Sequence, residues 1–301
     1  MTPILELRNV RKAYGKFVAV DSVSMAVPAG SIFGLLGPNG AGKTSSIRMI
    51  MNITAPDSGE VHVFGHPRTA ADLPRIGYLP EERGLYRKMT VMDQLVFLGE
   101  IRGLKGPKLT SEIQRWLERV DLGKWAKSKI EELSKGMQQK VQLIGTVLHQ
   151  PDLLILDEPF SGLDPLNQEL FRDLLQDYRA QGKSVVLSTH GMELAERMCD
   201  HICLISQGRA VLDGELRAIK RQIGGNAFRL VAEGDLDRVQ ALPEVEQATI
   251  QSGGVVKLLL RPEAQGSDAL RRMVEFLNVH EFRSEEPELE QIFLKAVRDA
   301  A

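Results

Sequence analysis

Short apolar runs alternate with segments of helical spacing along the first part of the chain. Residues 4–10 and 18–27 alternate apolar and polar side chains with a β-branched bias, which indicates half-buried strands. Residues 152–157 and 184–189 are almost unbroken apolar runs, typical of central strands that are covered on both faces. Helical spacing recurs between two of these strands, at residues 91–102, 110–120 and 135–149. The pattern predicts an α/β domain with a helical insertion.

A different pattern begins after Gly224. Short strand-like runs are followed by helical spacing over residues 267–277, which opens on a capping-type Ser267, and by a last helix over 288–297. The strand-like runs are residues 228–232, 248–251 and 255–260. We therefore predict one domain over residues 1–224, with a helical subdomain at about 82–150, and a small α+β domain over residues 225–301.

Composition narrows the class of protein. The 301 residues contain 38 Lys and Arg against 40 Asp and Glu, a net charge of -2, whereas nucleic-acid binders usually carry a basic surplus. Two cysteines give no disulfide framework and suit a reducing compartment. No apolar stretch approaches the ~20 residues that span a bilayer. We expect an intracellular protein that binds no nucleic acid and reaches a membrane only through a partner.

A phosphate-binding loop lies between an apolar strand and a helix. The stretch Gly37-Pro-Asn-Gly-Ala-Gly-Lys43-Thr44 matches G-x-x-x-x-G-K-[ST] in full. Its glycines allow backbone N–H groups to turn onto phosphate oxygens, Lys43 reaches the β- and γ-phosphates, and the Thr44 hydroxyl ligates Mg²⁺. The residues expected to contact the nucleotide here are Gly37, Pro38, Asn39, Gly40, Ala41, Gly42, Lys43, Thr44 and Ser45. The loop predicts a nucleoside triphosphate site.

Two carboxylates end the apolar run at 153–157. Asp157 at a strand end is placed to hold Mg²⁺, and the adjacent Glu158 can polarise an attacking water. The phosphate-binding loop alone does not separate a kinase, a GTPase and an ATPase, but the rest of the chain does.

Further motifs make the chain resemble one family, the ATP-binding subunits of ABC transporters. They occur in the family's order over residues ~4 to 220. These motifs are Gly77-Tyr-Leu-Pro-Glu81, Leu133-Ser-Lys-Gly-Met137, Asp157-Glu158, Ser161-Gly-Leu-Asp164 and Ser188-Thr-His190. The resemblance implies an α/β fold: a P-loop ATPase core with an antiparallel β-subdomain and a helical signature subdomain, followed here by the small α+β domain.

The same resemblance implies roles for single residues. Tyr14 falls where the family stacks an aromatic ring on adenine, and His190 falls where the family holds the γ-phosphate and the attacking water. The implied catalytic residues are Lys43, Glu158 and His190, and the implied metal ligands are Thr44, Glu81 and Asp157. Further nucleotide contacts are implied at Glu81, Ser134, Lys135, Gly136 and Asp164, the last four toward a second subunit. The implied cofactors are ATP and Mg²⁺.

Family resemblance also implies partners. Two such subunits, here expected to be identical, stack head to tail around two ATP molecules. The residues of the motifs and the presence of the carboxy-terminal domain resemble the ABC-2-type exporter branch, which is associated with drug resistance or sodium export. This implies a cytoplasmic protein held at the cell membrane by a separate permease, with residues 83–89 as the candidate docking loop. Cargo, direction of transport and the role of the last domain are not readable from the chain.

Three positions depart from the commonest family pattern. Glu81 stands where most members have Gln, Lys135 replaces a Gly, and Met137 replaces a Gln. We hypothesise that Glu81 and Lys135 together retune the charge of the site, against the simpler interpretation of a solvated Lys135.

Other interpretations remain in competition. A soluble ABC ATPase acting on ribosomes or DNA is the main alternative, although such proteins usually carry two cassettes or long coiled coils. A P-loop kinase would have no use for the segment 133–137. Cys199, His201 and Cys203 lack the spacing of a zinc site, and we interpret the cysteines as buried thiols.

Overall fold

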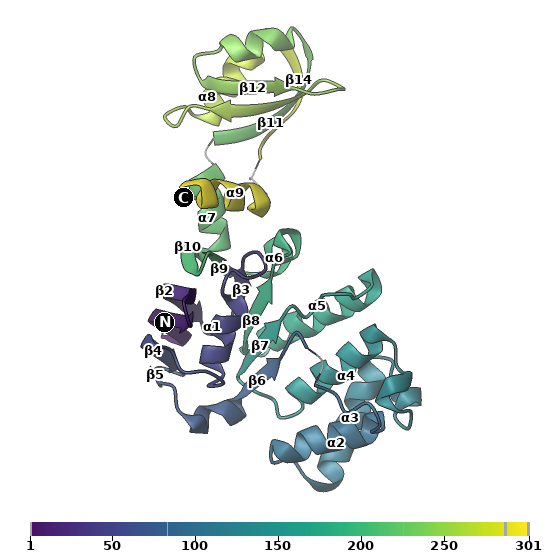
Figure 1. Cartoon of the computed structure of the whole chain (residues 1–301). Helices are drawn as coiled ribbons and strands as arrows, with labels where there is room; N and C mark the ends of the chain where they lie inside the picture. Colours follow the sequence, from purple (N-terminus) through teal and green to yellow (C-terminus); the bar gives the residue numbers. More distant parts are fainter. Residues whose placement is uncertain (1, 83, 225, 286–287, 300–301) are drawn as a thin grey trace. The chain divides into compact units, whose positions relative to one another are not determined.

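The computed structural model describes residues 2–82, 84–224, 226–285 and 288–299 (Figure 1). The chain forms two compact units, Met1–Asp213 and Gly214–Ala301. The change of pattern in the sequence predicts the division near residue 225 instead. The difference is helix α7 (Leu216–Gly224), which packs against α9 (Leu289–Asp299) of the second unit.

A largely parallel sheet forms the centre of the first unit. Its strand order is β10-β9-β3-β8-β7-β6, and the pairs β3/β8, β3/β9, β6/β7 and β7/β8 are parallel. Its strands are β3 (Ile32–Leu36), β6 (Ile76–Leu79), β7 (Leu153–Asp157), β8 (Ser184–Thr189), β9 (His201–Ser206) and β10 (Arg209–Glu215). Every position of β7 and β8 is buried, as their unbroken apolar runs predict. Parallel strands bring their carboxyl ends to one edge, where a ligand site can form.

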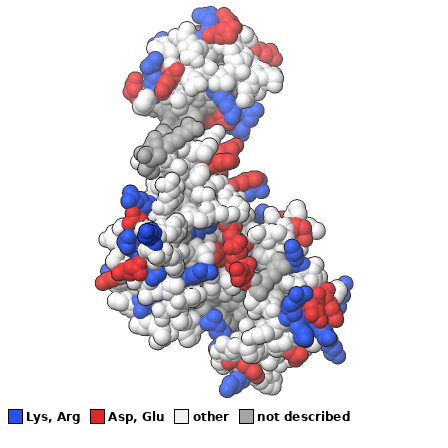
Figure 2. Space-filling model, in the orientation of Figure 1, with Lys and Arg blue, Asp and Glu red and all other residues white. Residues whose placement is uncertain are grey.

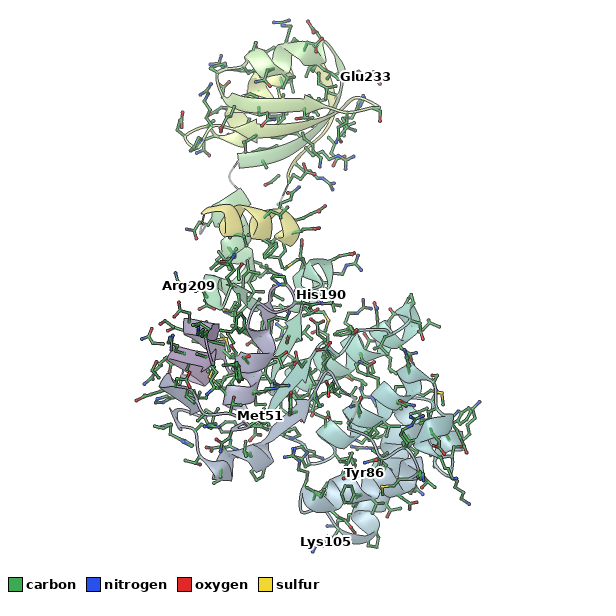
Figure 3. All side chains as sticks on the ribbon, viewed as in Figure 1. Met51, Tyr86, Lys105, His190, Arg209 and Glu233 are labelled. Atoms are coloured by element: carbon green, nitrogen blue, oxygen red, sulfur yellow. The ribbon has the colours of Figure 1, made fainter. Side chains whose placement is uncertain are left out.

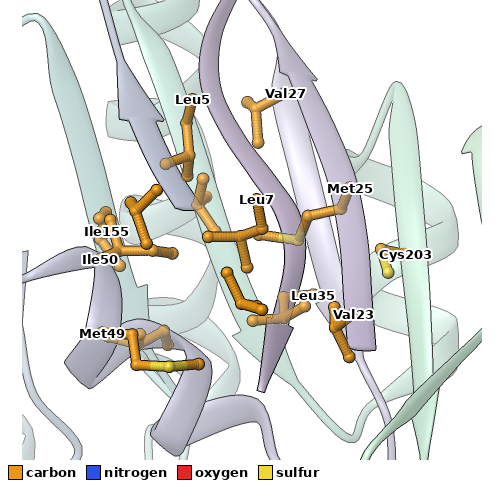
Figure 4. Close-up of a cluster of buried hydrophobic side chains, with 14 of the residues drawn as sticks. Leu5, Leu7, Val23, Met25, Val27, Leu35, Met49, Ile50, Ile155 and Cys203 are labelled. Atoms are coloured by element: carbon orange, nitrogen blue, oxygen red, sulfur yellow. The ribbon is translucent and has the colours of Figure 1, made fainter. Parts of the chain in front are cut away.

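An antiparallel sheet packs its apolar side chains into the same core. Its order is β2-β1-β4-β5, from β1 (Pro3–Tyr14), β2 (Phe17–Pro28), β4 (Ser58–Val63) and β5 (His66–Pro67). Leu7 and Met25 of this sheet lie in one cluster with Leu35 of β3 and Ile50 at the end of α1 (Figure 4). The cluster fixes the start of the phosphate loop, because β3 leads directly into it.

Helices surround the central sheet and fill the insertion between β6 and β7. Around the sheet lie α1 (Lys43–Ile50), α5 (Pro165–Ala180) and α6 (Met192–Met198), and the insertion contains α2 (Val91–Ile101), α3 (Gly106–Arg119) and α4 (Lys135–Val147). Thr90 caps α2, since its hydroxyl oxygen accepts a hydrogen bond from the backbone N–H of Asp93 at 3.1 Å. Ser134 caps α4 in the same way, by accepting a hydrogen bond from the backbone N–H of Met137 at 3.3 Å. The α/β fold and the helical insertion expected from the sequence are confirmed.

The second unit has its own sheet and core. The strands β11 (Asn226–Gly234), β12 (Val245–Ile250), β13 (Val255–Leu260) and β14 (Leu277–Ser284) form a sheet in the order β12-β13-β11-β14. With the short helix η4 (Leu236–Ala241) after β11 and α8 (Gly266–Met273) before β14, this is a split βαβ arrangement. The predicted helix over 267–277 was wrong at its end: α8 stops at Met273, and Leu277 begins β14, which pairs with β11.

The surface charges show no large patch of one sign on the visible face, and the helices show no membrane-spanning character in the described ranges. Lys and Arg side chains are interspersed with Asp and Glu side chains over the visible face (Figure 2). Within the described ranges, no helix has the length and apolar character needed to cross a membrane.

Candidate functional site

The loop between β3 and α1 adopts a conformation that only glycine tolerates at key positions. Gly37 has φ 149° and Gly42 has φ 112°. A Cβ atom on Gly37 would lie 2.2 Å from the carbonyl oxygen of Ile205, and one on Gly42 would lie 2.4 Å from that of Ala19. The motif glycines therefore let the loop wrap tightly in front of the amino terminus of α1.

Lys43 is the first residue of α1 and its side chain folds back under the loop. The side chain is 6% exposed, and its Nζ donates to the carbonyl oxygens of Gly37 at 2.7 Å and Pro38 at 3.2 Å. The same Nζ lies 3.6 Å from Oε1 of Glu158. A buried ammonium group thus connects the phosphate loop to the carboxylate at the end of β7.

Thr44 and Asp157 meet although 113 positions separate them in the chain. The Thr44 hydroxyl donates to Oδ2 of Asp157 at 3.0 Å. Asp157 is 1% exposed, and its Oδ1 is buried without a hydrogen-bond partner among the described residues. A buried carboxylate oxygen without a donor costs free energy unless a cation completes it.

Glu158 receives hydrogen bonds from two residues at the end of β8. Nδ1 of His190 lies 2.9 Å from Oε1, and the Thr189 hydroxyl donates to Oε2 at 3.3 Å. Glu158 has φ 48°, a left-handed conformation that is unusual for a residue with a side chain and is often found at functional sites. His190 is 59% exposed and lies where β8 ends before α6 (Figure 3). The carboxylate is therefore held in place while the imidazole stays open to solvent.

A cavity of about 270 Å³ lies between most of these groups, although His190 and Thr189 are not part of the lining formed by the described residues. Its lining includes the phosphate loop from Pro38 to Ser45, Glu81, Asp157, Glu158 and Phe17. Phe17, which is 62% exposed at the start of β2, is not predicted by any motif in the sequence. Tyr14, the aromatic residue proposed from the sequence, is 42% exposed and pairs with Phe17 across the β1–β2 hairpin, but is not part of the lining.

The signature segment lies apart from this cavity within one chain. None of Ser134, Lys135, Gly136 and Asp164 contributes to the lining formed by the described residues. Ser134 begins α4, and Asp164 begins α5, where it accepts the amide of Asn167 at 2.9 Å. This amide hydrogen bond is the main reason why the pKa of Asp164 lies below its ordinary value. Both segments present a helix amino terminus, which favours negative charge.

Known protein families match both units of the chain. Residues 20–161 match the model of the ABC transporter family, and residues 214–297 match the model of the carboxy-terminal domain of ATP-binding proteins like DrrA1-3. The solved structure of an ATP-binding subunit of an ABC transporter superposes with a TM-score of 0.68 at 31% identity, over 73% of this chain and 93% of that one.

Relatives extend the match to almost the whole chain. The uncharacterized ABC transporter ATP-binding protein YhaQ of Bacillus subtilis is 40% identical over 98% of each chain. The Nod factor export ATP-binding protein I of Cupriavidus pinatubonensis is 34% identical over 98% of this chain and 91% of its own. The chain therefore belongs to the ATP-binding proteins of ABC transporters, in the branch with a DrrA-like carboxy-terminal domain, and these proteins are ATPases that use ATP hydrolysis to drive transport.

Proposed function

We propose that this protein hydrolyses ATP as the nucleotide-binding half of an exporter, in a head-to-tail dimer that drives a separate ABC-2-type permease. The observation that carries the proposal is the position of Glu158, whose carboxylate lies 3.6 Å from Nζ of Lys43 and 2.9 Å from Nδ1 of His190 at the mouth of the phosphate loop. A base, a phosphate-binding cation and a switchable imidazole are thus in contact.

Lys43 links nucleotide binding to activation of the base. In the structure, its ammonium group is shared between two loop carbonyls and Glu158. A triphosphate in the loop offers a stronger anionic partner, so Lys43 turns toward the β- and γ-phosphates and leaves the carboxylate. Glu158 then accepts a proton from the attacking water, and His190 holds that water against the γ-phosphate.

The donor set around Asp157 fits a magnesium ion. Thr44 supplies a hydroxyl oxygen, Asp157 supplies an unpartnered carboxylate oxygen, and Glu81 lines the same cavity. When bound, Mg²⁺ neutralises charge that develops on the phosphate oxygens. The protein's own part is to hold Asp157 in a buried position at the end of a fully buried strand.

Head-to-tail pairing explains why the signature is remote from the phosphate loop of its own chain. The amino terminus of α4, with Ser134, Lys135 and Gly136, favours negative charge, and a second copy brings it to the γ-phosphate. Leu166 beside Asp164 is 80% exposed, which suits a residue that becomes buried against the partner.

The permease has a candidate docking groove in the helical subdomain. A groove of about 430 Å³ is lined mainly by apolar residues, among them Leu73, Pro74, Leu85, Leu98 and Ile101. Of the docking loop predicted at 83–89, Gly84 and Leu85 line this groove, while residue 83 lies outside the described residues. Such a groove accepts an amphipathic helix, so we place the protein on the cytoplasmic face of the membrane, held there by its permease. Export is supported by the likeness to Nod factor export proteins.

Two measurements test this function. Replacing Glu158 by Gln should trap an ATP-bound dimer, visible by light scattering after gel filtration, and adding Lys43→Ala should return the chain to a monomer. Purification of the chain from detergent-solubilised native membranes should bring a polytopic protein in constant ratio. A monomer under saturating Mg-ATP would exclude the proposed pairing, and ribosomal or DNA-repair proteins in place of a membrane protein would exclude the transport role.

The departures at Glu81 and Lys135 give a further test. If the second copy brings Lys135 near the site that Glu81 lines, the two charges couple through the γ-phosphate and its metal. We therefore expect the ATPase effects of Glu81→Gln and Lys135→Gly to be non-additive in the double variant. Strictly additive effects on the ATPase rate would contradict the proposed coupling between the two residues.

A further inference from the structure

The second unit carries an unusual row of cations on the face of its sheet that is turned away from its core. Leu230, Val256 and Leu258 point into that core, where Val239 of η4 and Met273 of α8 cover them. Side chains at alternate positions therefore point to the opposite face. On this face Arg229 of β11 stands directly opposite Lys257 of β13 on one side and Arg283 of β14 on the other. We call Lys257, Arg229 and Arg283 the basic row.

The outer members of the basic row have acidic partners, but within the described ranges the central member forms no ion pair. Nζ of Lys257 lies 3.7 Å from Glu285, and Nε of Arg283 lies 2.9 Å from Glu281. Arg229 is half-buried, and its Nε is shielded from solvent without a hydrogen-bond partner among the described residues. The Nε–H of the central guanidinium group thus lies between two cations and lacks an acceptor among the described residues.

This arrangement costs stability in the free protein. Like charges directly opposite each other on neighbouring strands repel, and a shielded donor without an acceptor loses its hydration. A carboxylate placed over Arg229 would remove both costs. Half-buried apolar pairs lie on either side of the row, Val231 with Val255 and Ala227 with Leu259. The unpartnered Nε–H of Arg229 therefore lies between two apolar stripes in the described part of the sheet.

We propose that this face binds a protein segment that places an Asp or Glu carboxylate over Arg229 and apolar side chains over the two flanking stripes. The row spans about 10 Å across three strands. That length suits an extended or helical segment laid on a sheet, whereas small anions are usually held in concave pockets. Recognition comes from a charge-assisted hydrogen bond in an apolar surround.

Other occupants fit the chemistry less well. A second copy of the same face would set cations against cations if the two-fold axis passed through the row. Membrane surfaces and nucleic acids bring many phosphates at once, and Glu281, Glu285 and Glu233 on this part of the sheet would repel those that do not lie over Arg229. A segment with a single carboxylate between apolar residues brings one negative charge, which lies over Arg229.

The test uses the whole chain in the presence of Mg-ATP and a display library of random peptides. Peptides selected on the unaltered chain should share an Asp or Glu between apolar residues. Their affinity should fall about tenfold or more for Arg229→Gln. It should stay unchanged for Arg271→Gln, an exposed arginine on α8 that is paired with Asp268. Selected peptides without an acidic excess, or with equal affinity for Arg229→Gln, would overturn the proposal.

Two further measurements separate this role from its alternatives. In the free chain, Arg229→Gln should leave the unfolding midpoint unchanged or higher, because an unsatisfied cation is removed; a lower midpoint would indicate a purely structural arginine. Sedimentation with phosphatidylglycerol vesicles, against phosphatidylcholine vesicles, should not depend on Arg229. Lipid binding that depends on Arg229 would indicate that this face binds a membrane surface and not a protein segment. ATP hydrolysis should be the same in all these variants, so a failure here leaves the proposed transport function intact.

Discussion

Glu158 combines backbone strain, burial and three polar neighbours at one position. Its left-handed backbone directs the carboxylate toward Lys43 and His190, and only 9% of the residue is exposed. Glu158→Gln keeps the size of the side chain and one accepting oxygen but removes its charge and its basicity. We expect the turnover number to fall by about 10²–10⁴-fold, as for loss of a general base, while ATP affinity stays within about threefold. Steady-state ATPase assays and equilibrium nucleotide binding measure the two quantities separately.

A matched control for this change is Glu193→Gln. Glu193 is 80% exposed on α6 and pairs only with Arg197 in the described part of the chain. Its replacement should leave the turnover number unchanged. A Glu158→Gln variant that hydrolyses ATP at the normal rate would move the role of base to another group.

The glycines of the phosphate loop differ in what they tolerate. A Cβ on Gly37 would collide with the carbonyl oxygen of Ile205 at 2.2 Å, while one on Gly40 would meet no atom within 4 Å. Both have positive φ, so both replacements by Ala strain the backbone. We expect Gly37→Ala to abolish ATP binding and lower the unfolding midpoint, and Gly40→Ala to cost only about 1 kcal/mol. Calorimetric titration and thermal unfolding of the two variants test this difference, which equal losses would contradict.

Local motifs predict most residues of the candidate site, but they do not predict the aromatic residue that lines its cavity. The spacing of the phosphate loop predicts the positions of Lys43 and Thr44, and the end of an apolar strand predicts Asp157 beside them. Tyr14 and Phe17 are both exposed aromatics on one hairpin. Which of them faces the cavity depends on hairpin register and twist, and these are not encoded in a short motif.

At the scale of elements, buried strands were easier to predict than exposed ones. The unbroken apolar runs at β7 and β8 leave no other interpretation, because both faces of these strands are covered. β14 was missed because most of its positions are exposed or half-buried, and polar side chains such as Asn278 and Arg283 dilute its alternation. Its strand form comes from pairing with β11, a contact across more than 40 residues that local pattern does not reveal.

The junction of α4 with the central sheet contains a histidine that makes stability depend on pH. Burial, together with the smaller effect of the nearby Arg102, lowers the pKa of His149 from 6.5 to about 4. The folded protein therefore keeps His149 neutral, while the unfolded chain gains a proton as the pH falls below 6.5. The contribution of His149 to the free energy of unfolding is fully present above pH 6.5 and is lost as the pH falls toward 4. The loss is about 1 kcal/mol after allowance for the exposed part of the ring.

The variant His149→Gln should remove this part of the pH dependence. Denaturant unfolding at pH 7.5 and pH 5 should give a smaller difference in the free energy of unfolding than for the unaltered chain. His280→Gln is the control, because His280 is 49% exposed on β14. An unchanged difference in His149→Gln would assign the pH dependence to other groups.

Across the whole molecule, each of the two units has a hydrophobic core of its own. The first unit builds its core from both of its sheets and places the nucleotide cavity at the carboxyl ends of parallel strands. The second unit builds its own core on one face of its sheet and leaves the basic row on the other. The family match of each unit follows the same division, at residues 20–161 and 214–297.

Docking on the permease is the whole-molecule event that the groove of the helical subdomain predicts. Ile101 lines this groove and is 64% exposed, an apolar surface that a permease helix would bury. We expect Ile101→Gln to weaken co-purification of the permease by about tenfold while the ATPase rate of the free chain stays unchanged, since Ile101 is not part of the nucleotide cavity. Ile250→Gln, at a residue 46% exposed in the second unit, is the matched control and should retain the permease. Equal retention by both variants would place the permease contact elsewhere on the surface, and a loss of ATPase rate in Ile101→Gln would show that the groove serves the nucleotide site directly.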